Sequence, residues 1–324
     1  MRNDRVFLTG ATGFVGSHVL RELLAAGFPV RALVRDKAAR LEDCEIVVGD
    51  VELAGELVDS LRDCRYLVHC AALYSFAPAD REALQRVNVD GTESLFAAAH
   101  VAGIERAVLT SSVATVGPMH GDAPSTEADY APEGGTGYHA SKLAQERAAV
   151  SSRVPTVVVL PTAPVGPNDH KPTPTGGMIL NFARGRMFAK PPSGGMNLVA
   201  VEDVARAHVA ALRDGRPGER YILGGENLTL DAIWELLSEI TGRPVPRVRI
   251  PTPLLYTIAY VDEVRCIIRR DAHPLAPLEG VRTAQERMFV DSSKAARELG
   301  FSPGPVRGAL ERAVNWYRDR GYLK

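Results

Sequence analysis

The sequence has few of the residues that mark several whole classes of protein. Its 4 cysteines in 324 residues form no C-x-x-C pair, so neither a disulfide scaffold nor a cysteine zinc site is indicated. Its 8 histidines show no H-x-x-H or H-E-x-x-H spacing, and we expect no metal. No apolar run approaches the ~18 residues of a membrane span, and the first residues contain no signal-peptide core. We therefore expect a cytoplasmic protein with reduced thiols and no membrane partner.

Net charge is also nearly absent. The 38 Lys and Arg residues balance 39 acidic ones, giving a charge of −1, and only 6 of the basic residues are lysine. A near-neutral chain has no overall field to attract nucleic acid, so we expect no nucleic-acid partner, although the arginine-rich composition raises that alternative. With 45% hydrophobic and 24% charged residues the composition is that of a globular protein, long enough for two domains.

Short apolar runs alternate with helical patterns over the first 160 residues. The runs are not alternating polar and apolar, which indicates strands covered on both faces, as in parallel sheets. With right-handed crossovers this predicts an α/β fold of the Rossmann type, a doubly wound parallel sheet. The expected strands are Val6–Thr9, Val30–Val34, Glu45–Val48, Tyr66–Cys70, Arg106–Ser111 and Thr156–Leu160, and the expected helices are Phe14–Ala26, Glu52–Arg62, Arg81–Ala102 and Tyr138–Ser151.

The pattern changes after residue 160. Five prolines between 161 and 177 predict a long loop with little helix or strand. Shorter elements follow: we expect helices near 178–185, 202–213, 230–241 and 253–270, and strands near 220–223 and 246–250. This predicts a dinucleotide-binding domain at 1–165 and a smaller α/β substrate-binding region at 166–324, interleaved with the sheet.

A glycine-rich turn follows the first expected strand and opens the first helix. Its glycines, Gly10, Gly13 and Gly16, have the spacing G-x-x-G-x-x-G. Glycine permits a tight turn and close approach of the backbone to a pyrophosphate, and the helix N-terminus favours anions. Thr12, Phe14 and Val15 complete the candidate phosphate-binding loop. The plainer alternative is a strand–helix turn built from small residues.

Three further residues form a candidate catalytic set. Tyr138 and Lys142 lie four residues apart on an expected helix, which places the phenol and the ammonium on one face. Ser112 follows the fifth strand, at the sheet edge where such folds bind ligands. A serine hydroxyl can orient a carbonyl, a tyrosine can exchange its proton, and an ammonium favours the phenolate. Alone, Ser112 is equally typical of a strand-end turn.

The end of the second strand bears on cofactor choice. Domains that prefer NAD usually place an acidic residue there, but this chain has Arg35, with Asp36 one position later. A guanidinium can bind a 2′-phosphate through two parallel hydrogen bonds, which predicts NADP. In the alternative, Arg35 is solvated and Asp36 holds the ribose of NAD.

These motifs, in this order and spacing, resemble the extended short-chain dehydrogenases/reductases, also described as the NAD-dependent epimerase/dehydratase family. The resemblance covers nearly the whole chain. Three later segments are similar to hopanoid-associated sugar epimerases and to dihydroflavonol-4-reductase-like proteins: residues 171–176, 197–203 and 218–228.

The resemblance implies roles for residues of this chain. Ser112 would orient the substrate, Tyr138 would be the acid/base, and Lys142 would bind the nicotinamide ribose and lower the tyrosine pKa. Asn88 matches a helix asparagine common in the family, for which a structural hydrogen bond is the plainer interpretation. Further cofactor contacts would come from Asp50 and Val51 at the adenine, Cys70, Ala71 and Ala72 at the ribose, and Pro161 and Thr162 at the nicotinamide amide.

Departures from the family patterns choose between reactions. Dehydratases carry an Asp-Glu pair after the catalytic hydroxyl residue, but here Val113 and Ala114 follow Ser112. Many epimerases carry an asparagine where this chain has Ala163, which cannot donate those hydrogen bonds. We therefore expect an NADP-dependent reductase of a ketone or aldehyde. The alternatives are a nucleotide-sugar epimerase with tightly bound NAD and a non-catalytic cofactor-binding regulator. A regulator would have no need of Tyr138 and Lys142, and both are present.

The substrate is expected to be a small molecule. Candidate wall segments of its pocket are Leu73, Tyr74 and Phe76, the loop 119–137, and residues 175–181 and 187–196, which mix aromatic, methionine and glycine residues. Relatives pair the helices that match Arg81–Ala102 and Tyr138–Ser151 into a four-helix interface, so the resemblance also implies a homodimer.

Overall fold

The structure is a computed structural model that describes residues 4–323 except 37–38, 40, 120, 133–136, 188, 191–193, 269–277 and 284. Its largest element is a sheet of seven parallel strands in the order β10-β6-β5-β4-β1-β2-β3. The chain runs outward from β1 through β3 and then crosses to β4 on the other side of β1. The expected doubly wound α/β sheet is confirmed. Its strands are β1 (Val6–Thr9), β2 (Val30–Val34), β3 (Glu45–Val48), β4 (Tyr66–His69), β5 (Arg106–Thr110), β6 (Thr156–Pro161) and β10 (Arg220–Leu223).

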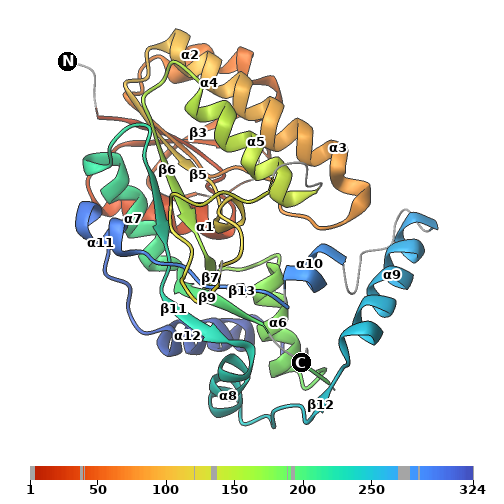
Figure 1. Cartoon of the computed structure of the whole chain (residues 1–324). Helices are drawn as coiled ribbons and strands as arrows, with labels where there is room; N and C mark the ends of the chain where they lie inside the picture. Colours follow the sequence, from red (N-terminus) through yellow and green to blue (C-terminus); the bar gives the residue numbers. More distant parts are fainter. Residues whose placement is uncertain are drawn as a thin grey trace.

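Alternate residues of the strands enter two separate cores. Val6 and Leu8 of β1 pack toward α1 (Phe14–Ala25) and α7 (Val201–Asp214), whereas Phe7 packs toward α4 (Gly91–Ala102). The helix α5 (Tyr138–Val150) lies beside α4 on that second face (Figure 1). Because helices cover both faces of the sheet, the strand sequences are continuous apolar runs.

The connection from β4 to β5 departs from the expected single helix Arg81–Ala102. It contains α3 (Arg81–Leu84), a wider π-helical turn (Gln85–Asp90) and then α4. Such turns often lie at functional sites. The expected helix Glu52–Arg62 is likewise divided, into a 3₁₀ segment (Val51–Leu57) and α2 (Val58–Leu61).

The remaining residues build a smaller layer below the carboxyl ends of the large sheet (Figure 1). Its core surrounds the buried pair Phe182 and Trp234, whose rings stack 5.7 Å apart. The layer consists of β7 (Ala163–Val165), β9 (Gly195–Ala200), β11 (Glu226–Thr229), β13 (Arg287–Met288), α6 (Pro174–Ala183), α8 (Leu230–Thr241) and α12 (Val306–Asp319). Further elements are β8 (Ala189–Lys190), β12 (Val248–Arg249), α9 (Thr252–Ile268), α10 (Leu278–Thr283) and α11 (Ser293–Leu299).

The expectation of a plain loop at residues 161–177 is wrong at both ends. β7 pairs with β9 within it, and α6 begins at Pro174. Proline fits both places, because it is tolerated in the first turn of a helix and at the margin of a sheet. The hydroxyl of Thr173 caps α6 by accepting the Gly176 amide hydrogen at 3.1 Å.

No helix in the part of the chain that the structure describes is long and apolar enough to cross a membrane.

Candidate active site

The glycine turn lies where the chain changes direction across the sheet, between the carboxyl ends of β1 and β4. Gly10 has φ +76°, and a Cβ there would lie 2.6 Å from the Ala71 backbone nitrogen. A Cβ on Gly16 would overlap the Gly10 carbonyl. Both positions therefore need glycine for the fold itself, whatever binds beside them.

Gly13 differs from its two neighbours in the motif. The nearest atom to a Cβ at Gly13 is the Gly10 carbonyl oxygen at 3.2 Å, a tight contact but a much milder one than those at Gly10 and Gly16. Gly13 is the N-cap of α1, no side chain caps this helix end, and its first turn contains no acidic residue. Thr12 is exposed, and Phe14 and Val15 are half-buried beside it. An uncapped helix N-terminus without nearby carboxylates fits the pyrophosphate of a dinucleotide.

Two arginines of the second strand region lie in different surroundings. Arg31 is buried in β2 and binds Glu45 at 2.9 Å and the Ser60 carbonyl, so its role is structural. Arg35 directly follows β2 and is exposed, as is Asp36. Arg35 therefore stands at the carboxyl edge of the sheet, where the 2′ position of an adenosine ribose is read in folds of this type.

The residues after β3 are held by local contacts. Asp50 caps the following 3₁₀ segment by accepting the Glu52 amide hydrogen at 3.1 Å. Val51 is buried, and its Cγ2 lies 3.1 Å from the position of a Cβ on Gly91. Asp50 is thus near the sheet edge, whereas the Val51 side chain packs under α4.

A buried polar network connects the ends of β1 and β4. The Thr9 hydroxyl pairs with His69 Nδ1 at 2.7 Å and accepts the Ala71 amide hydrogen at 3.2 Å. The neighbouring Cys70 Sγ accepts a hydrogen bond from Thr110 at 3.2 Å, and Ala72 is exposed. Burial lowers the pKa of His69 to about 3, so this ring is neutral and serves as a hydrogen-bonding bridge.

Lys142 lies at the inner end of this network. Its Nζ donates to the Thr110 carbonyl at 2.8 Å and to Gln145 Oε1 at 2.5 Å. Gln145 Nε2 in turn donates to the Thr92 hydroxyl at 3.0 Å, which pairs with His69 Nε2 at 2.9 Å. Lys142 is 2% exposed, and burial lowers its pKa to about 8. The sequence spacing found Lys142, but Gln145 was missed, although i+3 places it on the same face of α5.

Ser112 and Tyr138 line one cavity of about 270 Å³ at the carboxyl end of the sheet. Ser112 Oγ accepts the Ala114 amide hydrogen at 3.2 Å, which leaves the hydroxyl proton for donation. Tyr138 begins α5 one helical turn before Lys142, so the two side chains leave the same face of the helix. A hydroxyl donor, a phenol and a buried ammonium together provide the groups for proton exchange with a carbonyl.

An aromatic wall surrounds Tyr138. Its ring centroid lies 4.3 Å from that of Tyr74 and 5.9 Å from that of Phe76. Asn88, in the π-helical turn, fixes this loop: its Oδ1 accepts the Leu73 amide hydrogen at 2.7 Å and its Nδ2 donates to the Leu73 carbonyl and to Ser141. The structural interpretation of Asn88 therefore agrees with its contacts.

Thr162 follows β6 and also lines the cavity. Its hydroxyl donates to Asn197 Oδ1 at 2.9 Å, and its amide donates to the Leu223 carbonyl at 3.3 Å. Pro161 is buried at the end of β6. These contacts hold the strand end in place beside the cavity.

A buried ion pair supports the site from behind. Glu146 of α5 lies 2.7 Å from Arg220 Nε and accepts hydrogen bonds from Ser111 at 2.7 Å and Thr115 at 3.0 Å. Arg220 also donates to the carbonyls of Glu127 and Asp129, at 2.8 and 3.0 Å. The pair thereby ties α5 to the strand end that carries Ser112. It lies between elements distant in sequence, and no motif indicated it.

The expected wall segments supply part of the cavity lining. The lining residues found as predicted are Tyr74, Phe76, Thr175, Met178, Gly195 and Met196. Residues 120, 133–136, 188 and 191–193 of the expected segments lie outside the described residues. Residues that the sequence did not single out for the wall also line the cavity: Val113, Ala114, His139, Ala163, Pro174, Asn197 and Met288.

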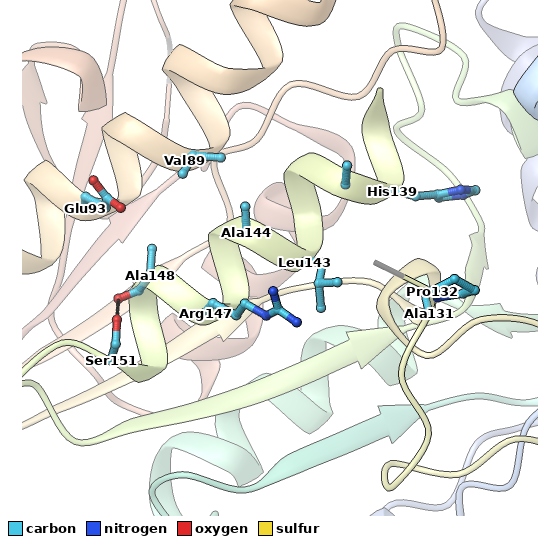
Figure 2. Close-up of a pocket in the computed structure, with 11 residues that line it drawn as sticks. Val89, Glu93, Ala131, Pro132, His139, Leu143, Ala144, Arg147, Ala148 and Ser151 are labelled. Atoms are coloured by element: carbon cyan, nitrogen blue, oxygen red, sulfur yellow. Dashed lines mark hydrogen bonds between the residues drawn. The ribbon is translucent and has the colours of Figure 1, made fainter. Parts of the chain in front are cut away.

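A second hollow lies on the outer face of α5, and His139 lines both this hollow and the cavity. Figure 2 shows Ala144 and Ala148 of α5 facing it, with Val89 and Glu93 on the neighbouring segment. Its volume is about 430 Å³, and its described lining contains none of Ser112, Tyr138 and Lys142.

Comparison with known proteins places this geometry in a family. The family model of the NAD-dependent epimerase/dehydratase family matches residues 6–224. A Synechocystis protein named provisionally as a dihydroflavonol 4-reductase is 42% identical over 99% of this chain and 96% of its own length. The sterol demethylase protein B of Methylococcus capsulatus is 37% identical over 98% of this chain and 99% of its own length.

The solved structures agree. The crystal structure of gox2253 superimposes with a TM-score of 0.87 at 38% identity, covering 99% of this chain and all of the other. The chain therefore belongs to the NAD-dependent epimerase/dehydratase family, within the extended short-chain dehydrogenases/reductases, and is an NAD(P)-dependent oxidoreductase.

Proposed function

We propose that the chain is an NADP-dependent oxidoreductase that reduces a ketone or aldehyde to an alcohol. The observation that carries this proposal is the shared cavity of Ser112 and Tyr138, with the Lys142 ammonium buried one helical turn behind. The uncapped end of α1 at Gly13 supports dinucleotide binding at the adjoining sheet edge. The reductase name of the Synechocystis relative favours net reduction.

Each residue of the set has a defined task. The nicotinamide cofactor, when bound, supplies the hydride for the carbonyl carbon. Ser112 donates a hydrogen bond to the carbonyl oxygen, and Tyr138 gives that oxygen its proton, leaving a phenolate. Among the described residues two acceptors receive hydrogen bonds from Lys142, the Thr110 carbonyl and Gln145 Oε1, and the third N–H would donate to the cofactor ribose. The positive charge of Lys142 also favours the phenolate.

Two other reactions of the family fit the cavity less well. Val113 and Ala114 line it directly after Ser112, where a dehydratase places two carboxylates. Ala163 lines it where many epimerases place an asparagine. Epimerisation with tightly bound NAD remains the second candidate, because it would use the same Ser112, Tyr138 and Lys142.

Cofactor consumption separates these two functions. The full chain is incubated with NADPH and a panel of ketones, aldehydes and sugar nucleotides, and reduced cofactor and products are measured after stopping the reaction. A reductase forms one alcohol for each NADPH consumed. A product of unchanged mass, formed without net loss of reduced cofactor, would instead identify an epimerase.

Removing the Arg35 guanidinium should discriminate between the cofactors. We expect Arg35→Ala to weaken NADPH binding by about 1–3 kcal/mol, the range for hydrogen bonds to charged groups, because the 2′-phosphate loses its partner. NADH lacks that phosphate and should bind almost as before. Calorimetric titration of both cofactors measures the difference.

Asp36 provides the matched control for this experiment. Asp36→Ala should leave NADPH affinity nearly unchanged. Two results together would show that the NADP assignment is wrong: the wild-type protein prefers NADH, and Asp36→Ala weakens NADH binding. The epimerase function would then gain support.

We also propose a homodimer that forms through the outer faces of α4 and α5. Ala140, Ala144 and Ala148 leave the hollow of about 430 Å³ in Figure 2, where small residues allow a second helix to approach. Val101 on α4 is 71% exposed and Val150 on α5 is 44% exposed. Light scattering at micromolar concentration should give twice the chain mass of 34.9 kDa, and a monomeric mass would contradict the proposal.

Location in the cytoplasm is part of the same proposal. All four cysteines are free thiols in the structure, and Cys64 and Cys266 are buried. Free thiols in a protein of this size are typical of a reducing compartment.

A further inference from the structure

The lining of the cavity beside Tyr138 also indicates the chemical class of the substrate, which rests on the proposed reductase function. The cavity of about 270 Å³ is near the lower end of the range for small-molecule pockets. Such a volume holds the reacting end of a substrate together with one or two rings, so its lining selects the part of the molecule next to the carbonyl.

One wall of the cavity is aromatic. Tyr74 and Phe76 lie with ring centroids 5.4 Å apart at an interplanar angle of 77°, and both contact the Tyr138 ring. Aromatic rings contribute large apolar surfaces and pack well against other flat apolar groups. The proton donor is thus set inside an apolar wall, and the group carrying the substrate oxygen must pass along it.

The lining also contains methionines from three separate elements. Met178 comes from α6, Met196 from β9 and Met288 from β13, which makes half of the chain's 6 methionines. Methionine is flexible and polarisable and adapts to apolar groups of varied shape. Their convergence from distant parts of the sequence indicates a surface for an apolar body.

The described lining residues include no Asp, Glu, Lys or Arg side chain. His139 is their one imidazole, and burial lowers its pKa, which favours the neutral form. Asn197 is engaged within the protein, since its Oδ1 accepts from Thr162 and Gly225 and one Nδ2 hydrogen goes to Asn227 at 2.8 Å. A nucleoside diphosphate is usually bound by cationic side chains, and the described lining supplies no Lys or Arg.

We propose that the substrate is an uncharged, largely apolar ketone or secondary alcohol without a phosphate group. Its oxygen lies between Ser112 and Tyr138, and its apolar body lies between the aromatic wall and Met178, Met196 and Met288. In the reducing direction the carbonyl carbon gains the hydride of the reduced cofactor and the oxygen gains the Tyr138 proton, giving the alcohol and the oxidised cofactor.

A panel of three probes tests the substrate class on the full wild-type chain. The probes include trans-1-decalone, an apolar bicyclic ketone, and dihydroxyacetone, a small polar ketone. With NADPH present, the kcat/KM for decalone should be at least about a hundredfold higher, because decalone buries several more methylene groups in the cavity. UDP-glucose should neither be converted nor compete with decalone. Equal or better use of dihydroxyacetone or UDP-glucose would overturn the inference and leave the oxidoreductase function standing.

A pair of variants locates the apolar contact. Met178→Asp places a charge in the wall and should raise the KM for decalone about tenfold or more, while Met178→Leu keeps an apolar surface and should change it little. The affinity for NADPH should be unchanged in both. If Met178→Asp keeps the wild-type KM, the methionine wall does not hold the substrate.

Binding without turnover separates the two proposals if no ketone is reduced. The proteins are then titrated calorimetrically with decalone and with UDP-glucose in the presence of NADP. Decalone binding that Met178→Asp weakens supports the apolar substrate class, although the proposed reduction has failed. Binding of UDP-glucose in place of decalone overturns the substrate class.

Discussion

Replacing Tyr138 by phenylalanine should lower the turnover number by a factor of about 10²–10⁴, the usual contribution of a positioned general acid. The substitution removes one oxygen and keeps the ring that packs against Tyr74 at 4.3 Å. Folding and cofactor affinity should therefore be retained. Steady-state rates of cofactor oxidation, measured beside a cofactor titration of the same variant, check both halves of the expectation.

Tyr130 offers a matched control for the loss of a phenol. It is 54% exposed, lies outside the cavity, and its ring stacks with Arg220 at 4.0 Å. Tyr130→Phe keeps that stacking and should leave turnover unchanged. Full turnover in Tyr138→Phe would show that another group donates the proton, and the roles of Ser112 and Lys142 would then need a new assignment.

Replacing Arg220 by leucine should lower the free energy of unfolding by about 3–5 kcal/mol, the range measured when one partner of a buried ion pair is removed. The side chains of Arg220 and Glu146 are only 7% and 5% exposed. The variant leaves the Glu146 carboxylate buried without its cation and deprives the carbonyls of Glu127 and Asp129 of donors. Denaturant titration followed by circular dichroism measures the loss.

Two comparisons show whether the loss comes from the stranded charge. Arg220→Leu combined with Glu146→Gln should be more stable than Arg220→Leu alone, because the buried carboxylate is gone. Arg307→Leu removes an arginine from an exposed pair with Glu239 and should cost less than about 1 kcal/mol. Similar losses of unfolding free energy in Arg220→Leu and Arg307→Leu would show that the buried pair contributes no more to stability than the exposed one.

Most of the large sheet could be predicted because its strands are buried on both faces. The limits of β1, β2 and β3 agree with the expected ranges, and β4, β5 and β6 differ by one residue. The strands β9 and β11 were missed, since each borders a helix and β11 is mostly polar and mostly exposed. The helices α11 and α12 were also not predicted, although the apolar face of α12 buries Val306, Leu310 and Val314.

The candidate site was predictable where chemistry depends on spacing within one segment. The glycine turn and the Tyr138–Lys142 pair are local patterns, so the chain order shows them directly. Gln145, Met288 and the pair of Glu146 with Arg220 act through contacts between remote segments, for example the 74 positions that separate Glu146 from Arg220. A single sequence carries no record of such pairings.

The late return of β10 to the large sheet has a consequence for how the polypeptide acquires its fold during synthesis. β10 covers the edge of β6, and α7 covers Val108, Val157 and Val159 on one face. A nascent chain released as far as residue 165 would present an open strand edge and an uncovered apolar face, both of which favour aggregation. Ribosome-bound chains should therefore resist proteolysis only after Leu223 has left the exit tunnel. We therefore expect the first 165 residues not to fold stably without the residues that follow them.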